Sequence, residues 1–159
     1  MSQVETRLAE LGIDLPPVAA PLAAYVPAVT TGSHVYTAGQ LPLRDGALLA
    51  SGRVGVEVDV PTAAACARQC ALNALAAVRA EVGDLDRVRR VDKVVGYVAS
   101  SAEFTGQPGV VNGASELLAE VFADAGVHAR SAVGVASLPL GAPVEVELIV
   151  EVGPPHEAA

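Results

Sequence analysis

The chain has 159 residues, a formal net charge of -8 and an isoelectric point of about 4.7. Nucleic-acid binding depends on cationic side chains that neutralise phosphates, so ten Lys and Arg residues disfavour such a partner. No apolar run reaches the roughly 18 residues of a membrane span, and residues 1–12 lack an apolar signal segment, so we expect no membrane partner and a cytoplasmic location. Aromatic residues make up only 3% of the chain and hydrophobic residues 52%, which predicts an aliphatic core and spare apolar surface for a homo-oligomer.

The N-terminal segment predicts a short helix followed by a stiff connector. Ser2 and Glu5 form a capping-box pattern, and apolar residues follow at helical spacing up to Gly12. Three prolines lie between residues 15 and 21, which favours an extended run. We therefore divide the chain into residues 1–20, the helix and Pro-rich connector, and residues 21–153, a single domain.

From Tyr25 onward the pattern changes to strands, with two helices between them. A turn at residues 31–33 predicts a β-hairpin, and either Asp59 or Thr62 caps a long helix that ends at Gly83. The expected ranges are strands at 28–30, 34–38, 47–50, 91–99, 129–136 and 144–152, a loop at 100–109, and a second helix at 113–125.

This order, β-β-β-α-β-α-β-β, predicts an α+β fold with a mixed β-sheet covered on one face by two helices. The last strand carries valines and a leucine on one face and Ile149 on the other. The uncovered face is therefore partly apolar, and a symmetric oligomer is the arrangement that would cover it.

Arg130 and Glu145 are the candidate catalytic residues. An arginine offers a rigid fork of donors that matches a carboxylate, and a glutamate held nearby can accept a proton from water. Glu147 lies on the same face of its strand as Glu145, and we assign it a structural role. On the residues alone, a strand-edge arginine paired with a surface acid is the simpler explanation of Arg130.

Four segments together resemble the Rid family, also called the YjgF family, over nearly the whole chain from Pro21 to Val152. They are Tyr25-Val26, Tyr36-Thr37-Ala38-Gly39-Gln40-Leu41-Pro42, Ala129-Arg130-Ser131 and Val144-Glu145-Val146-Glu147. The N-terminal helix and the widened loop at residues 100–109 are similar to a longer subgroup of that family.

The resemblance implies a chorismate mutase-like homotrimer, in which the sheets form a barrel-like core, the helices lie outside, and ligand clefts lie between subunits. It also implies hydrolysis of reactive 2-imino acids, or their enamine tautomers, to 2-keto acids and ammonia. The family reaction uses no metal and no organic cofactor. On this basis Arg130 holds the substrate carboxylate and Glu145 is the general base.

The resemblance also implies five substrate-binding positions. Tyr25 walls the cleft and donates a hydrogen bond, Gly39 lets the ligand approach its backbone, and Asn112 is a polar residue before the second helix. Ala38 and Ala132 stand where the family's deaminases often carry serine and cysteine. Tyr25 as a core residue and Gly39 as a plain turn residue remain alternative explanations.

Because Ala38 and Ala132 differ from the residues of the family's deaminases, a second function remains an alternative. It is a regulatory homotrimer that binds small carboxylates without turnover. A third, RNA cleavage, requires a basic groove that a charge of -8 makes hard to assemble. Cys66 and Cys70 lie one helical turn apart with no companion ligands, so we expect two buried thiols rather than a metal site.

Overall fold

The computed structural model describes residues 2–154 and contains a five-stranded mixed sheet with the strand order β1-β2-β7-β5-β6. Adjacent strands are antiparallel except β5 and β6, which are parallel. This confirms the α+β prediction. The strands are β1 (Ala28–Thr31), β2 (His34–Thr37), β5 (Val88–Ala99), β6 (Ala129–Val135) and β7 (Val144–Val152).

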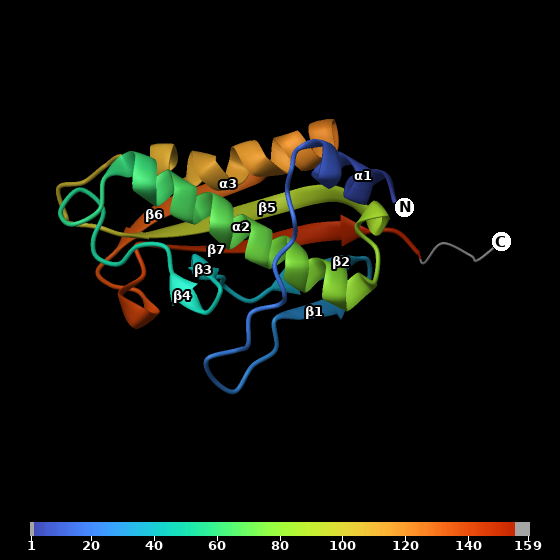
Figure 1. Ribbon diagram of the computed structural model, residues 1–159, viewed down its shortest axis with the longest axis horizontal. Helices are drawn as coiled ribbons and strands as arrows, with labels where there is room; N and C mark the ends of the chain where they lie inside the picture. The colour runs from blue at the N-terminus through green and yellow to red at the C-terminus, as the bar shows by residue number, and fades with distance from the viewer. Residues whose placement is uncertain (1, 155–159) are drawn as a thin grey trace.

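Two long helices, α2 (Val60–Val82) and α3 (Gln107–Phe122), lie side by side over one face of the sheet (Figure 1). Asp59 is the N-cap of α2, because its carboxylate accepts a hydrogen bond from the Thr62 N–H at 2.8 Å. The two helices approach closely at Gly113, where a side chain would overlap the carbonyl oxygen of Ala64. Cys66 and Cys70 are buried free thiols in α2, as predicted.

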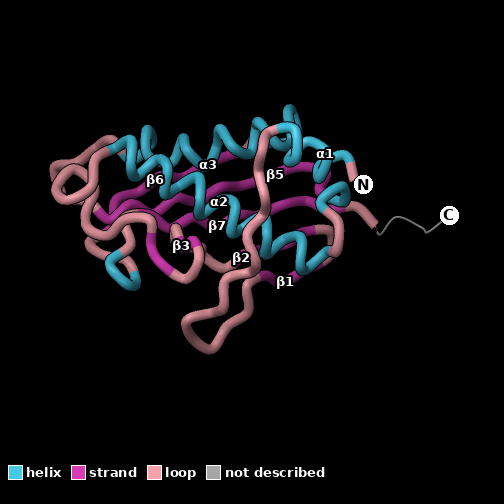
Figure 2. The backbone as a smooth tube through the Cα atoms, viewed as in Figure 1, coloured by secondary structure: helices cyan, strands magenta, loops and turns pink. Residues whose placement is uncertain are grey.

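The N-terminal segment forms α1 (Gln3–Glu10), with Ser2 as its N-cap. The Asp86 carboxylate accepts hydrogen bonds from the Gln3 and Val4 N–H groups at 2.7 and 2.8 Å, which anchors α1 to the corner before β5. The connector then passes across α2 before it reaches β1 (Figure 2). Within residues 2–154, no helix combines the length and apolar character needed to cross a membrane.

Three sequence expectations were wrong in detail. First, β5 begins at Val88 rather than at residue 91. The predicted loop at residues 100–109 is shorter, because α3 begins at Gln107 rather than residue 113 and ends at Phe122. Pro108 is compatible with this start, since a first-turn residue needs no intrahelical N–H donor. The strand expected at residues 47–50 is β4 (Ala47–Leu48), which pairs with β3 (Leu43–Arg44) in a separate two-stranded sheet.

Strand β7 divides the molecule into a buried and an open face. Side chains at its even positions are at most 5% exposed and pack under the helices, whereas those at odd positions are half-buried on the opposite face. Val29, Tyr36 and Val133 are large apolar residues of β1, β2 and β6 that are 43–48% exposed. The described protomer thus leaves one sheet face uncovered.

Candidate functional site

Arg130 lies on the edge strand β6, and three groups of helix α3 hold its guanidinium. Nη1 donates to Asn112 Oδ1 at 2.8 Å and to Ser115 Oγ at 3.1 Å, and Nη2 donates to the Pro108 carbonyl at 3.3 Å. Asn112 and Ser115 are three residues apart, so they lie on one face of the helix. The early start of α3 places Pro108 and Asn112 inside the helix, which corrects the expectation that Asn112 precedes it.

These contacts leave part of Arg130 available for a ligand. A guanidinium carries five N–H donors, of which Nη1 uses two and Nη2 uses one. Among residues 2–154 no acceptor is bonded to Nε, so the Nε–H and one Nη2 N–H remain. Nε and Nη2 share one edge of the planar group, and such an edge can pair with both oxygens of a carboxylate.

Glu145 lies at the start of β7, on the open face of the sheet, and contacts Gly39. A side chain at residue 39 would overlap the Glu145 carboxylate in its present position, so the absence of a side chain at Gly39 lets Glu145 lie there. The backbone makes room for this contact. Tyr36 pairs with Ile149 and Gln40 pairs with Val146, so four steps along one segment match three along the other, as in a β-bulge.

The chemistry of Glu145 differs from that of a solvated carboxylate. Burial raises its pKa above the ordinary value, and the negative charge of Glu147 raises it further. Glu147 accepts a hydrogen bond from the Tyr97 hydroxyl at 3.3 Å. A glutamate with a raised pKa exchanges protons closer to neutral pH, which suits general acid–base work.

Within one protomer, Arg130 and Glu145 lie on opposite faces of the sheet. Arg130 pairs with Val94 and Glu145 pairs with Tyr97, and the two partners are three residues apart in β5. Side chains three apart along a strand face opposite ways, and directly paired residues share a face. Arg130 accordingly contacts α3, whereas Glu145 points away from the helices.

Of the other predicted substrate-binding residues, some lie near Arg130 and some lie near Glu145. Ala132 pairs with Gly96, two residues beyond Arg130 and on its face of β6. Tyr25 and Ala38 line a shallow groove of about 480 Å³ near β1 and β2, and Tyr25 also lines a small pocket with Gly39. The Tyr25 hydroxyl accepts a hydrogen bond from the Leu22 N–H at 3.2 Å, so in the protomer it is an acceptor within its own loop.

The comparisons with known proteins decide the family. The profile described as "YjgF/chorismate_mutase-like, putative endoribonuclease" matches residues 5–152. The chain belongs to the YjgF family. Its sequence is also 47% identical to "Protein TCP17" of Trypanosoma cruzi over 150 residues, which is 94% of each chain.

Two solved structures are similar to this YjgF chain in sequence and in fold. The protein Atu1372 from Agrobacterium tumefaciens, described as of unknown function, is 48% identical, with a TM-score of 0.88 over 94% of this chain and 92% of that one. E. coli TdcF, solved with bound serine, is 25% identical, with a TM-score of 0.59 over 87% of this chain and 94% of that one. The fold and the family are thus shared with both.

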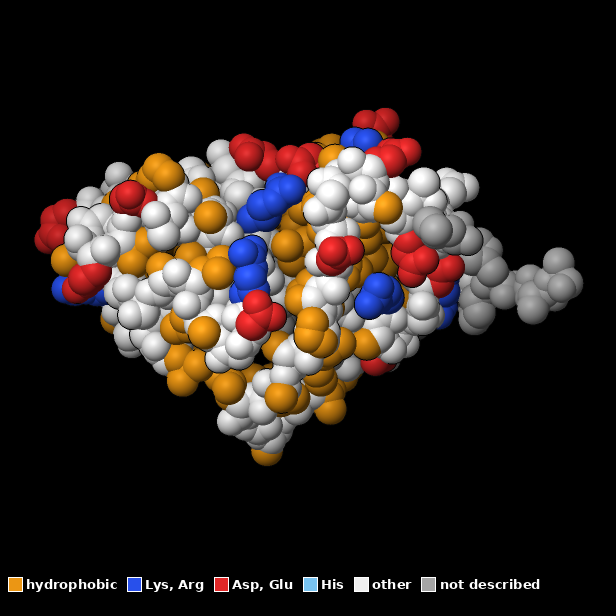
Figure 3. Space-filling view, in the orientation of Figure 1, with side chains coloured by type: hydrophobic (Ala, Val, Ile, Leu, Met, Phe, Trp, Pro, Cys, Tyr) orange, Lys and Arg blue, Asp and Glu red, His pale blue; other side chains and the backbone are white. Residues whose placement is uncertain are grey.

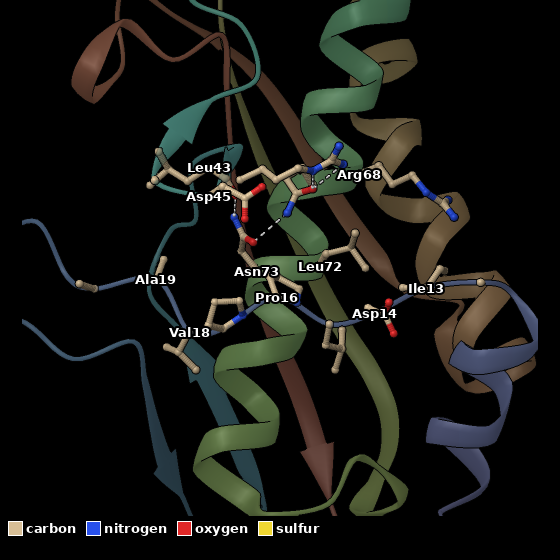
Figure 4. Close-up of a pocket in the computed structure, with 17 residues that line it drawn as sticks. Ile13, Asp14, Pro16, Val18, Ala19, Leu43, Asp45, Arg68, Leu72 and Asn73 are labelled. Atoms are coloured by element: carbon tan, nitrogen blue, oxygen red, sulfur yellow. Dashed lines mark hydrogen bonds between the residues drawn. The ribbon is translucent and has the colours of Figure 1, made fainter.

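A large cavity of this YjgF chain lies away from both Arg130 and Glu145. It has a volume of about 820 Å³ and lies between the connector, the β3–β4 hairpin and α2 (Figure 4). Figure 3 shows its apolar floor with basic surface along one side. Arg44 donates to Gln69 Oε1 at 3.1 and 2.9 Å, and Gln69 donates to Asn73 at 3.0 Å. Gln69 thus occupies the Nε–Nη2 edge of Arg44, the edge that would pair with a carboxylate, so we do not regard the cavity as the carboxylate site.

Sequence reasoning missed two residues that touch this site. Ser115 was not singled out, although it follows Asn112 at the helical spacing that puts both on one face. His128 was not singled out either. Its ring reaches both the Gly126 carbonyl and the Ser115 hydroxyl that contacts Arg130.

Proposed function

We propose that the chain hydrolyses 2-imino acids, or their enamine tautomers, to 2-keto acids and ammonia without a cofactor. The observation that carries this proposal is the anchored guanidinium of Arg130, which keeps its Nε–H and one Nη2 N–H for a carboxylate. The bound serine of the related TdcF supports it, because an amino acid has a carboxylate and a nitrogen on the adjacent carbon, as an imino acid does.

The proposed reaction needs one carboxylate and one water. Glu145 takes a proton from water as the oxygen attacks the C=N carbon, and the same proton passes to the nitrogen to give a carbinolamine. Glu145 then carries the hydroxyl proton to the amino nitrogen, the C–N bond breaks, the C=O bond forms and ammonia leaves. Arg130 fixes the substrate by its carboxylate, which keeps the reacting carbon in place.

The proposed site requires two subunits, because Arg130 and Glu145 lie on opposite faces of one protomer. We place the Arg130 half of one subunit against the Glu145, Gly39 and Tyr25 half of a neighbour in a homotrimer. The uncovered apolar sheet face supports such an assembly, since burial of apolar surface is favourable.

The test is keto-acid release from freshly formed 2-imino acids. An amino-acid oxidase supplies the imines, semicarbazide traps those that remain, and the traces are compared with wild-type protein, with Arg130→Ala and without protein. We expect faster clearance of the imine with the wild type, and a loss of about 100-fold or more in Arg130→Ala because a charged bidentate contact is removed. No acceleration across imines of different side chains would overturn the proposal.

The second candidate is a homotrimer that binds small carboxylates and does not turn them over. Ala38 and Ala132 favour it, because neither offers a polar side chain to the reacting atoms. It predicts Arg130-dependent binding of a 2-keto acid together with an absence of imine hydrolysis. RNA cleavage, which the family description names, is disfavoured by the net charge of -8.

A further inference from the structure

A chain of hydrogen bonds runs from a buried turn to the guanidinium of Arg130. His128 Nδ1 lies 2.6 Å from the Gly126 carbonyl oxygen, and His128 Nε2 lies 2.9 Å from Ser115 Oγ. Ser115 Oγ in turn accepts from Arg130 Nη1 at 3.1 Å. The Gly126 end is fixed, because this residue is buried and a side chain there would overlap the Leu118 carbonyl of α3.

The partners determine where the protons lie. A carbonyl oxygen can only accept, so Nδ1 of His128 carries a hydrogen. In the neutral imidazole Nε2 is then an acceptor, so the Ser115 hydroxyl donates its hydrogen to Nε2. With its hydrogen committed to His128, the Ser115 oxygen presents a lone pair to Arg130 Nη1.

We propose that His128, acting through Ser115, is a positioning residue that sets the orientation of Arg130 for carboxylate binding. Without the histidine, the Ser115 hydroxyl is free to rotate and to donate to other acceptors in α3. Nη1 then loses one of its two fixed partners and retains only Asn112. This inference rests on the proposed role of Arg130, and it adds two residues that do not themselves touch the substrate.

The local sequence explains why these groups meet. Ser115 and Asn112 share a face of α3, and His128 lies at the junction between the turn after α3 and strand β6. Arg130 is two residues beyond His128. One face of α3 and the segment that leads into β6 therefore supply the four side chains.

The first test is the tautomer and the mobility of the side chains in wild-type protein. Nitrogen-15 NMR at alkaline pH should show His128 protonated on Nδ1 and unprotonated on Nε2. Rotation of the Arg130 guanidinium about its Cζ–Nη1 bond should be slow, and faster in Ser115→Ala and in His128→Ala. An Nε2-protonated His128, or an unchanged rotation in both variants, would overturn the proposal.

The second test is titration of the intact protein with 2-oxobutanoate by calorimetry. We expect Ser115→Ala and His128→Ala each to weaken binding about three- to tenfold, the effect of one lost hydrogen bond. The double variant should be no weaker than the worse single variant, because both changes break one pathway. Ser115→Thr keeps the hydroxyl and should restore affinity, and Glu116→Ala, an exposed neighbour on α3, is the control.

The outcomes separate this inference from the proposed function. If wild-type protein binds 2-oxobutanoate but does not hydrolyse imines, the deaminase proposal fails and the positioning role is still tested by affinity. If Ser115→Ala and His128→Ala weaken binding additively, or leave it unchanged while Arg130→Ala abolishes it, the positioning role is wrong. If the wild type does not bind, the NMR rotation rates decide whether His128 restrains Arg130.

Discussion

The Glu145 carboxylate fills the space that a side chain at residue 39 would take, so Gly39 and Glu145 form one packed unit. The unit lies where the β2 side gains one extra residue relative to β7. Thr37 compensates for the altered ladder, because its hydroxyl accepts the Leu148 N–H at 3.0 Å. The β-bulge therefore aims Glu145 without leaving that buried donor unpaired.

Gly39→Ala should displace the Glu145 carboxylate and reduce both activity and stability. The added methyl group meets the far end of the flexible Glu145 side chain, so the carboxylate turns to another position at a cost of about 1 kcal/mol. Thermal unfolding and the imine-clearance assay measure the two effects. Gly109→Ala is the matched control, because a side chain at residue 109 meets open space. An imine-clearance rate for Gly39→Ala equal to that of Gly109→Ala would contradict the contact.

Glu145→Gln should abolish hydrolysis and yet stabilise the protein at neutral pH. Burial raises the pKa of Glu145 above its model-compound value of 4.5, so between that value and the folded pKa the native state binds more protons than the unfolded state. Stability of the wild type therefore falls as pH rises through this window, and the neutral amide removes the loss.

The stability gain should be small, about 1–2 °C in Tm, because the carboxyl is only half-buried and water screens the penalty. It should shrink as pH is lowered and vanish well below 4.5, where the wild-type carboxyl is protonated in both states. Scanning calorimetry across this pH range measures it, with Glu116→Gln as an exposed carboxylate control. A gain that persists unchanged at the acidic end would show that its cause is not the charge.

Mixed oligomers test whether Arg130 and Glu145 act across a subunit boundary. Arg130→Ala and Glu145→Gln should each be inactive alone, but co-expressed subunits should regain about a quarter of wild-type activity, because one cleft in four joins an intact arginine to an intact glutamate. The assembly should sediment at three times the 16.0 kDa of one chain. A site within one protomer predicts no recovery.

The sequence predicted most accurately the elements whose side-chain pattern repeats. Strand β7 was expected at residues 144–152 and has these bounds, because its alternation of aliphatic and acidic residues continues to both ends. The start of α3 was missed because Gly106, Pro108 and Gly109 are typical of a loop. All three are compatible with the N-cap or first turn of a helix, where local composition does not decide the structure.

The site was predictable in its members but not in its arrangement. The residue types of Arg130 and Glu145 indicate their chemistry, but sequence spacing cannot show that they pair with β5 residues three apart and so face opposite ways. The His128–Ser115 contact depends on how the turn after α3 folds back. That geometry arises from the packing of Gly126 against α3 rather than from any local pattern.

We expect Asn73, which lines the large cavity, to stabilise the fold and not to contact a ligand. Its amide donates to the Leu41 and Leu43 carbonyls at 2.9 and 3.0 Å, and its side chain is 2% exposed. Asn73→Asp replaces the amide donor by an acceptor that faces the Leu41 and Leu43 carbonyls, of which Leu41 keeps only the Leu43 N–H at 2.8 Å, and this should cost about 2–3 kcal/mol in the free energy of unfolding.

Denaturant unfolding measures this cost, with Asp45→Asn on the exposed hairpin as the control. Below its melting temperature, Asn73→Asp should bind 2-oxobutanoate as the wild type does, because Arg130 and its partners on α3 are unchanged. Arg44, Gln69 and Asn73 form hydrogen bonds within the protein at this cavity. Loss of the Asn73 amide should therefore weaken the packing of the β3–β4 hairpin and leave ligand affinity unchanged. Weaker ligand binding at unchanged stability would instead make this cavity the binding site.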